Sequence, residues 1–441
     1  MLARSVTVNI AGTAVSLVVA FVASILLARW LGPSGRGLLA IMVQSANVVF
    51  ALSALGVPVA VTYYASRPDV SSQRLLGNSL LSAAVLAVVF VPLFWLLRGP
   101  IGDLVARGHS GSAWVLAGAL VPLTFLDWST HNQLLGTLRF VRFNVLVVVS
   151  RLAYVAAICA LVGAGGLGVT GGLAALGLAS AVMVVGSLPP LLRGGPPVVD
   201  RGLFRALVRY GSRVQVGTIL QLLNYRFDVF ILQFFRPLRE VGYYVAASVL
   251  AELVITLANA FQSSVLPLVS HYEGDEQQAA TTRASVRHHG ILAFAATLAN
   301  AAFAPLVIVY AYGASFHPSL VPVFILLPGM WFLGTGTVVA GDLRGRGRPG
   351  LSSAVAAASV IVTVALDFAL IPPFGIAGAA VASVAAYVVY GVGSLVALEH
   401  ASAIPLRELV IPTRADFALY ATAVRRALAR LRGPAAAAPE G

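Results

Sequence analysis

Long runs of apolar residues, separated by short polar gaps, follow one another along most of the sequence. Each run is about as long as the roughly 20 residues that a helix needs to cross the hydrocarbon layer. The runs are continuous and do not alternate apolar with polar residues, which favours helices over the strands of a membrane barrel. The pattern predicts an all-α integral membrane protein with about twelve spans, at residues 8–31, 38–65, 76–97, 113–136, 143–164, 169–192, 210–235, 243–270, 290–313, 320–342, 351–371 and 376–398.

The composition supports a membrane protein. Hydrophobic residues make up 59% of the 441 residues and charged residues only 10%, whereas about 25% of a soluble protein is charged. So few charges cannot cover a soluble surface, and the spans leave no room for a large catalytic domain. The single cysteine, Cys159, lies within an apolar run, which excludes an internal disulfide and a cysteine metal cluster.

The positive charges predict the orientation of the chain in the membrane. All 29 basic residues are arginines; the tails and loops on one side of the predicted membrane hold 21 of them, and the alternate loops hold 6. Arginine accumulates on the cytoplasmic side of membrane proteins, so both termini are expected in the cytoplasm. These arginines lie in short gaps between spans, and the net charge of +13 therefore does not indicate a nucleic-acid partner.

The two halves of the predicted bundle repeat each other at a nearly constant spacing. Gly37 recurs as Gly242, 205 residues later, and Gly168 recurs as Gly375, 207 residues later. Six spans is an even number, so both halves would enter the membrane in the same direction, as in transporters built from parallel repeats. We expect a six-helix lobe at 1–192, a linker at 193–209, a second six-helix lobe at 210–398 and a cytoplasmic tail at 399–441.

Two segments outside the spans are amphipathic. In 200–209 the arginines share one helical face, Leu203 and Leu207 lie elsewhere, and Asp200 can cap the helix. In 417–431 an apolar stripe that includes Phe417 runs beside three arginines. Both segments are predicted to be helices on the anionic cytoplasmic membrane surface.

Ionisable side chains within the spans are functional candidates, because charged groups in hydrocarbon are costly and rare. Asp367, in the eleventh span, is one such group, and Asp342 lies nearer the cytoplasmic boundary. The residues proposed for substrate binding or ion coupling are Asp127, His131, Arg151, Arg213, Gln221, Asn224, Arg226, Asp228 and Glu252.

The seventh span carries polar residues on two sides. At 100° per residue, five residues fall within an arc of about 80°: Arg213, Gly217, Gln221, Asn224 and Asp228. Gln215, Arg226 and Gln233 lie on the opposite side. A helix surrounded by lipid would not be polar on both sides, so one stripe is predicted to face a water-filled cavity and the other a neighbouring helix.

The hairpins between spans suggest partners for the two arginines within them. Arg151 is nearly level with Asp127 and His131 if spans four and five are antiparallel, and Arg226 is nearly level with Glu252 on the next span. Each arginine could form an ion pair that holds two helices together. Each could equally bind substrate or take part in coupling, and a paired arginine can exchange its partner for a phosphate.

The sequence lacks the usual motifs of an enzyme. No glycine-rich loop is followed by the lysine of a phosphate-binding motif, and no HExxH zinc motif occurs. His288 and His289 are adjacent and are predicted to be a solvated pair in a cytoplasmic loop. We expect no enzyme activity, no metal site and no cofactor, and a coupling ion would be H⁺ or Na⁺.

Several segments resemble the Wzx-type oligosaccharide flippases of the multidrug/oligosaccharidyl-lipid/polysaccharide exporter superfamily. They cover nearly the whole chain in order, and the motifs are Leu26–Ala40, Tyr225–Glu252, Asp342–Gly350 and Leu370–Ser383. The resemblance implies two six-helix lobes in a V around a central cavity that opens alternately to each side. It also implies an undecaprenyl-diphosphate-linked oligosaccharide as the substrate, moved across the bacterial plasma membrane for surface polysaccharide assembly.

A lipid-linked oligosaccharide flippase is therefore the first functional hypothesis, with the lipid-linked oligosaccharide, membrane lipids, a polysaccharide polymerase and glycosyltransferases as partners. Within the spans, however, there are only two arginines but four carboxylates, at Asp127, Asp228, Glu252 and Asp367. This excess favours a second hypothesis, a cation-coupled multidrug antiporter of the same fold. A third is a membrane scaffold of a glycan-synthesis complex that transports nothing.

Overall fold

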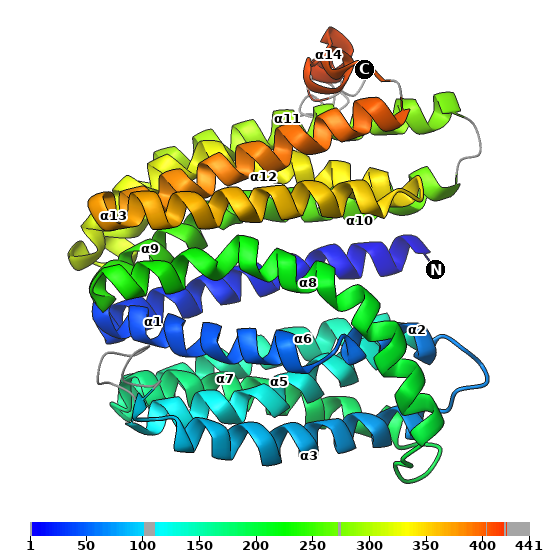
Figure 1. The fold of residues 1–441 in the computed structure, drawn as a ribbon, viewed down its shortest axis with the longest axis vertical. Helices are drawn as coiled ribbons and strands as arrows, with labels where there is room; N and C mark the ends of the chain where they lie inside the picture. Colours follow the sequence, from blue (N-terminus) through cyan, green and yellow to red (C-terminus); the bar gives the residue numbers. More distant parts are fainter. Residues whose placement is uncertain (1, 101–110, 272–274, 403, 419, 421–441) are drawn as a thin grey trace, which may run out of the picture. The chain divides into compact units, whose positions relative to one another are not determined.

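The computed structural model describes residues 2–100, 111–271, 275–402, 404–418 and 420, and Figure 1 shows their arrangement. The described chain is helical. Its elements are α1 Leu2–Ser53, α2 Val57–Ala65, α3 Ser72–Leu96, α5 Gly111–Gly136, α6 Phe140–Ala157, η1 Ile158–Ala164, α7 Gly168–Leu191, α8 Arg201–Phe235, α9 Leu238–Ala251, η2 Glu252–Val254, α10 Ile255–His271, α11 Asp275–Leu306, η3 Val307–Tyr312, η4 Ala314–Ser319, α12 Leu320–Gly345, α13 Pro349–Ser402 and α14 Leu406–Val410.

The predicted count of about twelve spans is confirmed. Within the described residues, nine helical segments are long and apolar enough to cross a membrane. Two of them are long enough for two spans each and are interrupted by a glycine with positive φ: Gly32 (φ 64°) in α1 and Gly375 (φ 56°) in α13. Both glycines fall in predicted gaps between spans, where the left-handed backbone favours glycine. The predicted seventh span, 210–235, is the later part of α8, a helix of 35 residues that begins with the predicted amphipathic segment.

The chain divides into two compact units. The first comprises residues 1–249, 304–322 and 363–382, and the second comprises residues 250–303, 323–362 and 383–441. In the first unit, one large core cluster joins α1, α5, α6 and α7, while another joins α2, α3, α5 and the start of α8. In the second unit, a core cluster joins α10, α11, α12, the end of α13 and α14. The predicted lobes at 1–192 and 210–398 are a different division of the chain and stay a prediction.

Two segments from later in the chain belong to the first unit, and specific contacts attach them. Arg29, on α1, donates hydrogen bonds to the carbonyl oxygens of Tyr310 (2.5 Å) and Ala311 (2.7 Å) in η3. Arg236, directly after α8, donates to the carbonyl oxygens of Pro372 (3.1 Å) and Pro373 (3.3 Å) in α13. The second contact brings the kinked middle of α13 to the end of α8.

The predicted repeat appears as a reciprocal contact between α1 and α9. A Cβ atom on Gly37 would lie 2.0 Å from the carbonyl oxygen of Leu238, and one on Gly242 would lie 1.9 Å from that of Pro33. Pro33 and Leu238 are separated by the same 205 residues as the two glycines. Each copy of the repeat therefore offers the same surface to the other, as at a two-fold symmetric interface.

The predicted amphipathic helix at 200–209 is the first part of α8. Asp200 caps it as predicted, because its Oδ1 accepts a hydrogen bond from the backbone N–H of Leu203 at 3.0 Å. The prediction that this segment lies on the membrane surface is wrong for its apolar face. Leu203 and Leu207 are buried in a core cluster with residues of α2, α3 and α5. Asn78, on α3, also exchanges hydrogen bonds with the backbone of Asp200 in both directions, each at 3.1 Å.

The two adjacent histidines both lie on α11, not in a loop, and they are not a solvated pair. His289 is fully buried against Phe261, whereas His288 forms a 2.9 Å hydrogen bond with the hydroxyl of Tyr420. Asp416 lies 3.7 Å from Arg287 and 3.9 Å from His288. The beginning of the predicted amphipathic tail therefore packs on α11, and the rest of that tail, from residue 421, is outside the described residues.

Candidate functional site

Two carboxylic acids from distant parts of the chain lie within electrostatic range of each other inside the first unit. Asp228, on α8, is only 4% exposed, and Asp367, on α13, is 0% exposed. The charge of Asp228 acts directly on Asp367. The two groups are 139 residues apart in sequence, and the attachment of α13 to the end of α8 brings their helices together.

The two carboxyl groups differ in their hydrogen bonds. The hydroxyl of Tyr244, on α9, donates to Oδ2 of Asp228, and the backbone N–H of Val229 lies 2.7 Å from Oδ1. Neither oxygen of Asp367 has a hydrogen-bond partner among the described residues. Buried polar groups are nearly always hydrogen-bonded, so an exception in the interior marks a candidate for ligand or proton binding. The sequence identified both as ionisable groups within spans but placed only Asp228 among the candidate site residues.

The other candidates on α8 lie in different surroundings. Arg213 is exposed and Arg226 is half-buried, while the side chains of Gln221 and Asn224 are outside the described part of the protein. The opposite stripe meets a neighbouring helix, as predicted, because buried Gln215 donates a hydrogen bond to the carbonyl oxygen of Ala51 on α1. Asp228, from the first stripe, is buried as well.

The predicted ion pair between spans four and five is replaced by a pair within one helix. Asp127 and His131, one turn apart on α5, lie 3.7 Å from each other, from Oδ1 to Nδ1. Arg151, on α6, is exposed, and no ion pair joins it to Asp127 in the described part of the chain. Hairpin spacing estimated the depth of these residues but not the direction in which each side chain points.

The predicted pair of Arg226 and Glu252 stays a prediction. Arg226 belongs to the first compact unit, and Glu252, which begins η2 between α9 and α10, belongs to the second.

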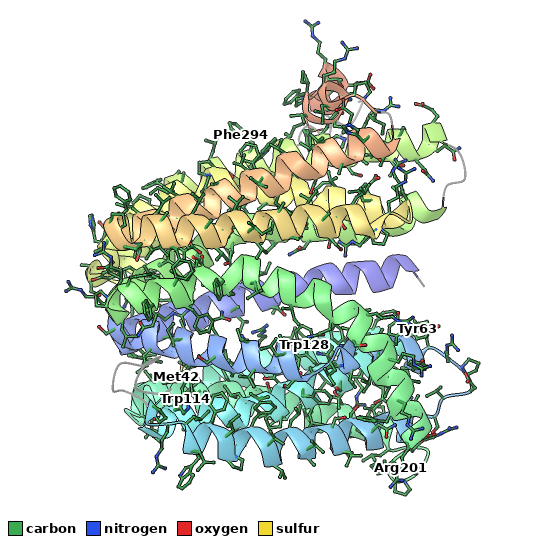
Figure 2. The ribbon with its side chains drawn as sticks, in the orientation of Figure 1. Met42, Tyr63, Trp114, Trp128, Arg201 and Phe294 are labelled. Atoms are coloured by element: carbon green, nitrogen blue, oxygen red, sulfur yellow. The ribbon has the colours of Figure 1, made fainter. Side chains whose placement is uncertain are left out.

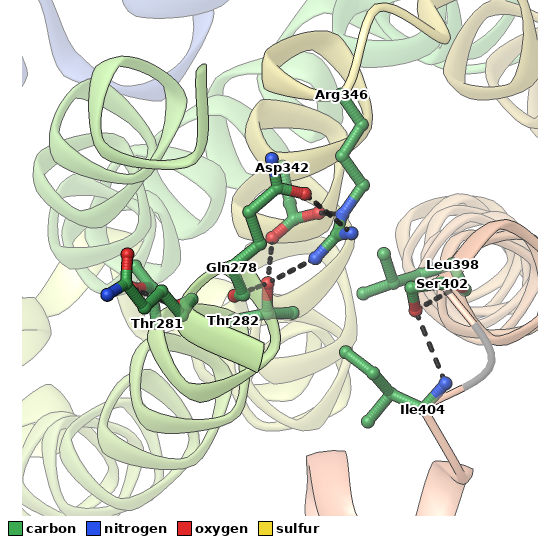
Figure 3. Close-up of polar contacts among 9 residues, drawn as sticks. Gln278, Thr281, Thr282, Asp342, Arg346, Leu398, Ser402 and Ile404 are labelled. Atoms are coloured by element: carbon green, nitrogen blue, oxygen red, sulfur yellow. Dashed lines mark hydrogen bonds and ion pairs between the residues drawn. The ribbon is translucent and has the colours of Figure 1, made fainter. Parts of the chain in front are cut away.

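A polar network in the second unit joins α11 to α12 near the predicted cytoplasmic boundary (Figure 3). Buried Asp342 accepts a hydrogen bond from Arg346 Nε at 2.5 Å and another from the hydroxyl of Thr282. The same guanidinium donates to Thr282 at 3.0 Å and to the side-chain carbonyl of Gln278 at 3.1 Å. Every carboxylate oxygen in this network has a donor, so its arrangement is that of a contact holding two helices together.

The fold and these groups define a polytopic helical membrane protein with ionisable side chains inside its bundle. The chain belongs to the polysaccharide biosynthesis protein family, whose pattern matches residues 2–273.

A curated relative is described as a probable low-salt glycan biosynthesis flippase, Agl15, of Haloferax volcanii. It is 26% identical over 189 residues, which cover 42% of this chain and 40% of that protein. The matched part is thus less than half the length of the relative.

Two kinds of solved structure share the fold of this chain. One is the lipid II flippase MurJ in an inward closed conformation, with a TM-score of 0.72, 15% identity, and coverage of 92% of this chain and 89% of that one. The other is an inward-facing multidrug resistance transporter of the MATE family, with a TM-score of 0.70, 17% identity, and coverage of 89% and 96%. At these identities the likeness shows the fold alone.

Proposed function

We propose that this protein is a flippase for oligosaccharides linked to undecaprenyl diphosphate. It would move them from the cytoplasmic to the outer leaflet of a bacterial plasma membrane, with both of its termini in the cytoplasm, and so supply surface polysaccharide assembly. Family membership supports the glycan, and the fold supports transport. A polymerase and glycosyltransferases would be its neighbours in the pathway.

The observation that carries the transport mechanism is the carboxyl pair of Asp228 and Asp367. Two carboxylates placed together in a low-dielectric interior repel each other, and binding one proton or one Na⁺ removes much of that repulsion. Tyr244 holds Asp228 in place, whereas Asp367 keeps both oxygens available among the described residues. Binding and release of H⁺ or Na⁺ at this pair would couple an ion gradient to the conformational cycle.

Arg226 is the proposed contact for the substrate diphosphate. In this scheme it pairs with Glu252 in the resting state, and the diphosphate displaces that carboxylate through a bidentate contact. A lysine cannot form the same fork, so Arg226→Lys should fold but export poorly. Wild-type export from both Arg226→Lys and Arg226→Ala would exclude this role.

The test compares two buried aspartates in a strain that lacks the wild-type protein. Asp367→Asn keeps the shape of the side chain and removes its charge, so it should fold normally, abolish surface polymer and accumulate lipid-linked precursor. Asp342→Asn should instead reduce folded yield, because it weakens a satisfied network. Protein level, precursor and polymer are measured for each variant, and Asp69→Asn, in an exposed loop, is the control.

The alternatives give different results in the same strain. A multidrug antiporter would leave the polymer unchanged and lose drug tolerance in Asp367→Asn. A scaffold would lose polymer on deletion of the protein and retain it in Asp367→Asn. In proteoliposomes, substrate movement driven by a pH gradient or by a Na⁺ gradient identifies the ion, and movement of equal rate without either gradient would contradict coupling.

A further inference from the structure

Trp128 is an exposed aromatic residue deep within a span. It lies on α5, eight residues before the end of that helix at Gly136, which is about 12 Å at 1.5 Å per residue. Tryptophan in membrane proteins is concentrated at the two interfaces and is much less common at this depth. Trp128, which is labelled in Figure 2, is nevertheless 41% exposed. Anchoring at the membrane interface therefore does not account for its position, and the polar side chains beside it decide whether its exposed face meets lipid or water.

The neighbours of Trp128 indicate that this face of α5 borders water. Asp127 and His131 form their pair directly beside it, and their side chains are 22% and 23% exposed. Partly exposed ionisable groups at this depth are costly against lipid and are tolerated where they line a water-filled cavity. No hydrogen bond to the Asp127 carboxylate is present among the described residues, so its oxygens can accept hydrogen bonds from a ligand.

Aromatic rings from three helices surround these polar groups. Phe50, on α1, lies 5.7 Å from Trp128 between ring centroids, and Phe143, on α6, lies 5.5 Å from His131. The rings of Trp128 and His131 are 6.0 Å apart. All of these residues belong to the first compact unit. The indole of Trp128 thus offers a flat apolar surface, with the carboxylate of Asp127 and the imidazole of His131 at its edge.

We infer that Trp128, Asp127 and His131 form a subsite for one sugar ring of the transported glycan. A pyranose has an apolar face of C–H groups, which packs on an indole, and an edge of hydroxyl groups, which donate to a carboxylate and exchange hydrogen bonds with an imidazole. A polyprenyl chain has no hydrogen-bond donor for the carboxylate of Asp127, and a diphosphate would be repelled by its negative charge. This inference rests on the proposed function and assigns the glycan, as opposed to its carrier, to this place.

The experiment measures binding to the full-length protein in lipid nanodiscs with two probes. One is the polyprenyl-diphosphate-linked oligosaccharide purified from membranes of the source organism, and the other is undecaprenyl diphosphate without sugar. Trp128→Leu and Asp127→Asn should each weaken binding of the first probe by about tenfold, as expected for the loss of a ring contact or a charged hydrogen bond. Binding of the second probe should not change.

Two further variants control for folding and for chemistry. Trp128→Phe keeps an aromatic ring and should retain more affinity for the glycan probe than Trp128→Leu. If the leucine variant folds poorly, Trp128→Phe is compared with the wild type in its place. Trp95→Leu removes an exposed tryptophan from α3, away from this site, and should bind both probes like the wild type.

Three results would overturn the sugar subsite. Unchanged binding of the glycan probe to Trp128→Leu, or an equal loss of affinity for both probes, would show that Trp128 does not bind the sugar. Binding of a lipophilic cation such as ethidium that depends on Trp128 and is unaffected by the glycan probe would assign the site to drugs. If the wild type bound neither the lipid-linked oligosaccharide nor undecaprenyl diphosphate, the proposed function itself would fail. Unchanged binding of the glycan probe to Trp128→Leu, or an equal loss of affinity for both probes, would leave the proposed function intact.

Discussion

The reciprocal glycine contact between α1 and α9 makes a sharp prediction about stability. Gly37→Ala would place a methyl group 2.0 Å from a backbone carbonyl oxygen, and Gly242→Ala would place one 1.9 Å from another. Ordinary contacts of a Cβ atom begin at 3.4 Å, so each methyl group needs more than an ångström of extra space. The obstacle is backbone, which cannot turn aside as a flexible side chain can, and α1 and α9 must therefore move apart.

The size of the effect follows from two opposing contributions. Overpacking costs typically about 1–3 kcal/mol, and an obstacle made of backbone places this site at or above the upper limit. Alanine is favoured over glycine in a helix by about 1 kcal/mol, which offsets part of that cost. The net expectation for either substitution is a loss of about 2 kcal/mol of folding free energy.

The double variant tests whether the two contacts are one interface. Both methyl groups widen the same crossing, so the second should cost much less than the first, and the combined loss should fall well short of the sum. The assay is thermal unfolding of purified protein in detergent, together with folded yield. Gly350→Ala is the control, because a Cβ atom there meets nothing within 4 Å and the melting temperature should be unchanged or higher.

Equal melting temperatures for Gly37→Ala, Gly242→Ala and the wild type would refute the close approach of α1 and α9. Fully additive losses would show that the two contacts are independent, which would contradict a shared symmetric interface.

Three other properties can be tested separately. The backbone N–H of Leu203, at the start of α8, and the side chain of Arg74 hold the pKa of Asp200 below its usual range. The stability from this cap is therefore present at neutral pH and lost as the pH falls through the lowered pKa. Asp200→Asn should flatten the acidic part of a plot of melting temperature against pH. Asp416→Asn should loosen residues 413–418 from α11, because it removes the charge that pairs with Arg287 and His288. Hydrogen exchange should rise there and stay unchanged in α14, which buried Leu409 and the hydrogen bond from Arg287 to the carbonyl oxygen of Glu408 still hold. The arginine distribution predicts that a reporter fused after Arg348 is cytoplasmic and one fused after Pro373 is external, and the reverse at either site would contradict the orientation.

The spans could be predicted because their signals are local. Gly32 and Gly375 interrupt apolar runs at the places where the helices change direction, and a hydropathy pattern needs no knowledge of the rest of the fold to locate them. The glycine spacing of the repeat was also visible, although only the structure shows that Gly37 and Gly242 pack against each other's helices.

The side-chain partners could be predicted less well, because they depend on how each helix is rotated about its axis. The estimated depths of Arg151 and Asp127 in the membrane suggested that these two residues meet. Asp127 instead pairs with His131, four residues later on the same helix, and this spacing can be recognised in the sequence. His289 looked solvated beside His288, but adjacent residues of a helix point about 100° apart, so one faces the core and the other the tail.

The buried aspartates differ in what surrounds them, and this difference separates structure from function. Asp342 costs little to bury because Arg346 and Thr282 satisfy both of its oxygens, and those bonds hold α11 to α12. Asp367 is buried as completely, yet neither of its oxygens has a hydrogen-bond partner in the described chain, and a second carboxyl group acts on it. The burial of Asp367 costs stability without joining two elements, and the proposed binding and release of an ion there would explain why it is kept. Trp128 is likewise exposed deep in a span, unlike Trp95 at the end of α3, and the proposed sugar subsite would give its exposed ring a partner.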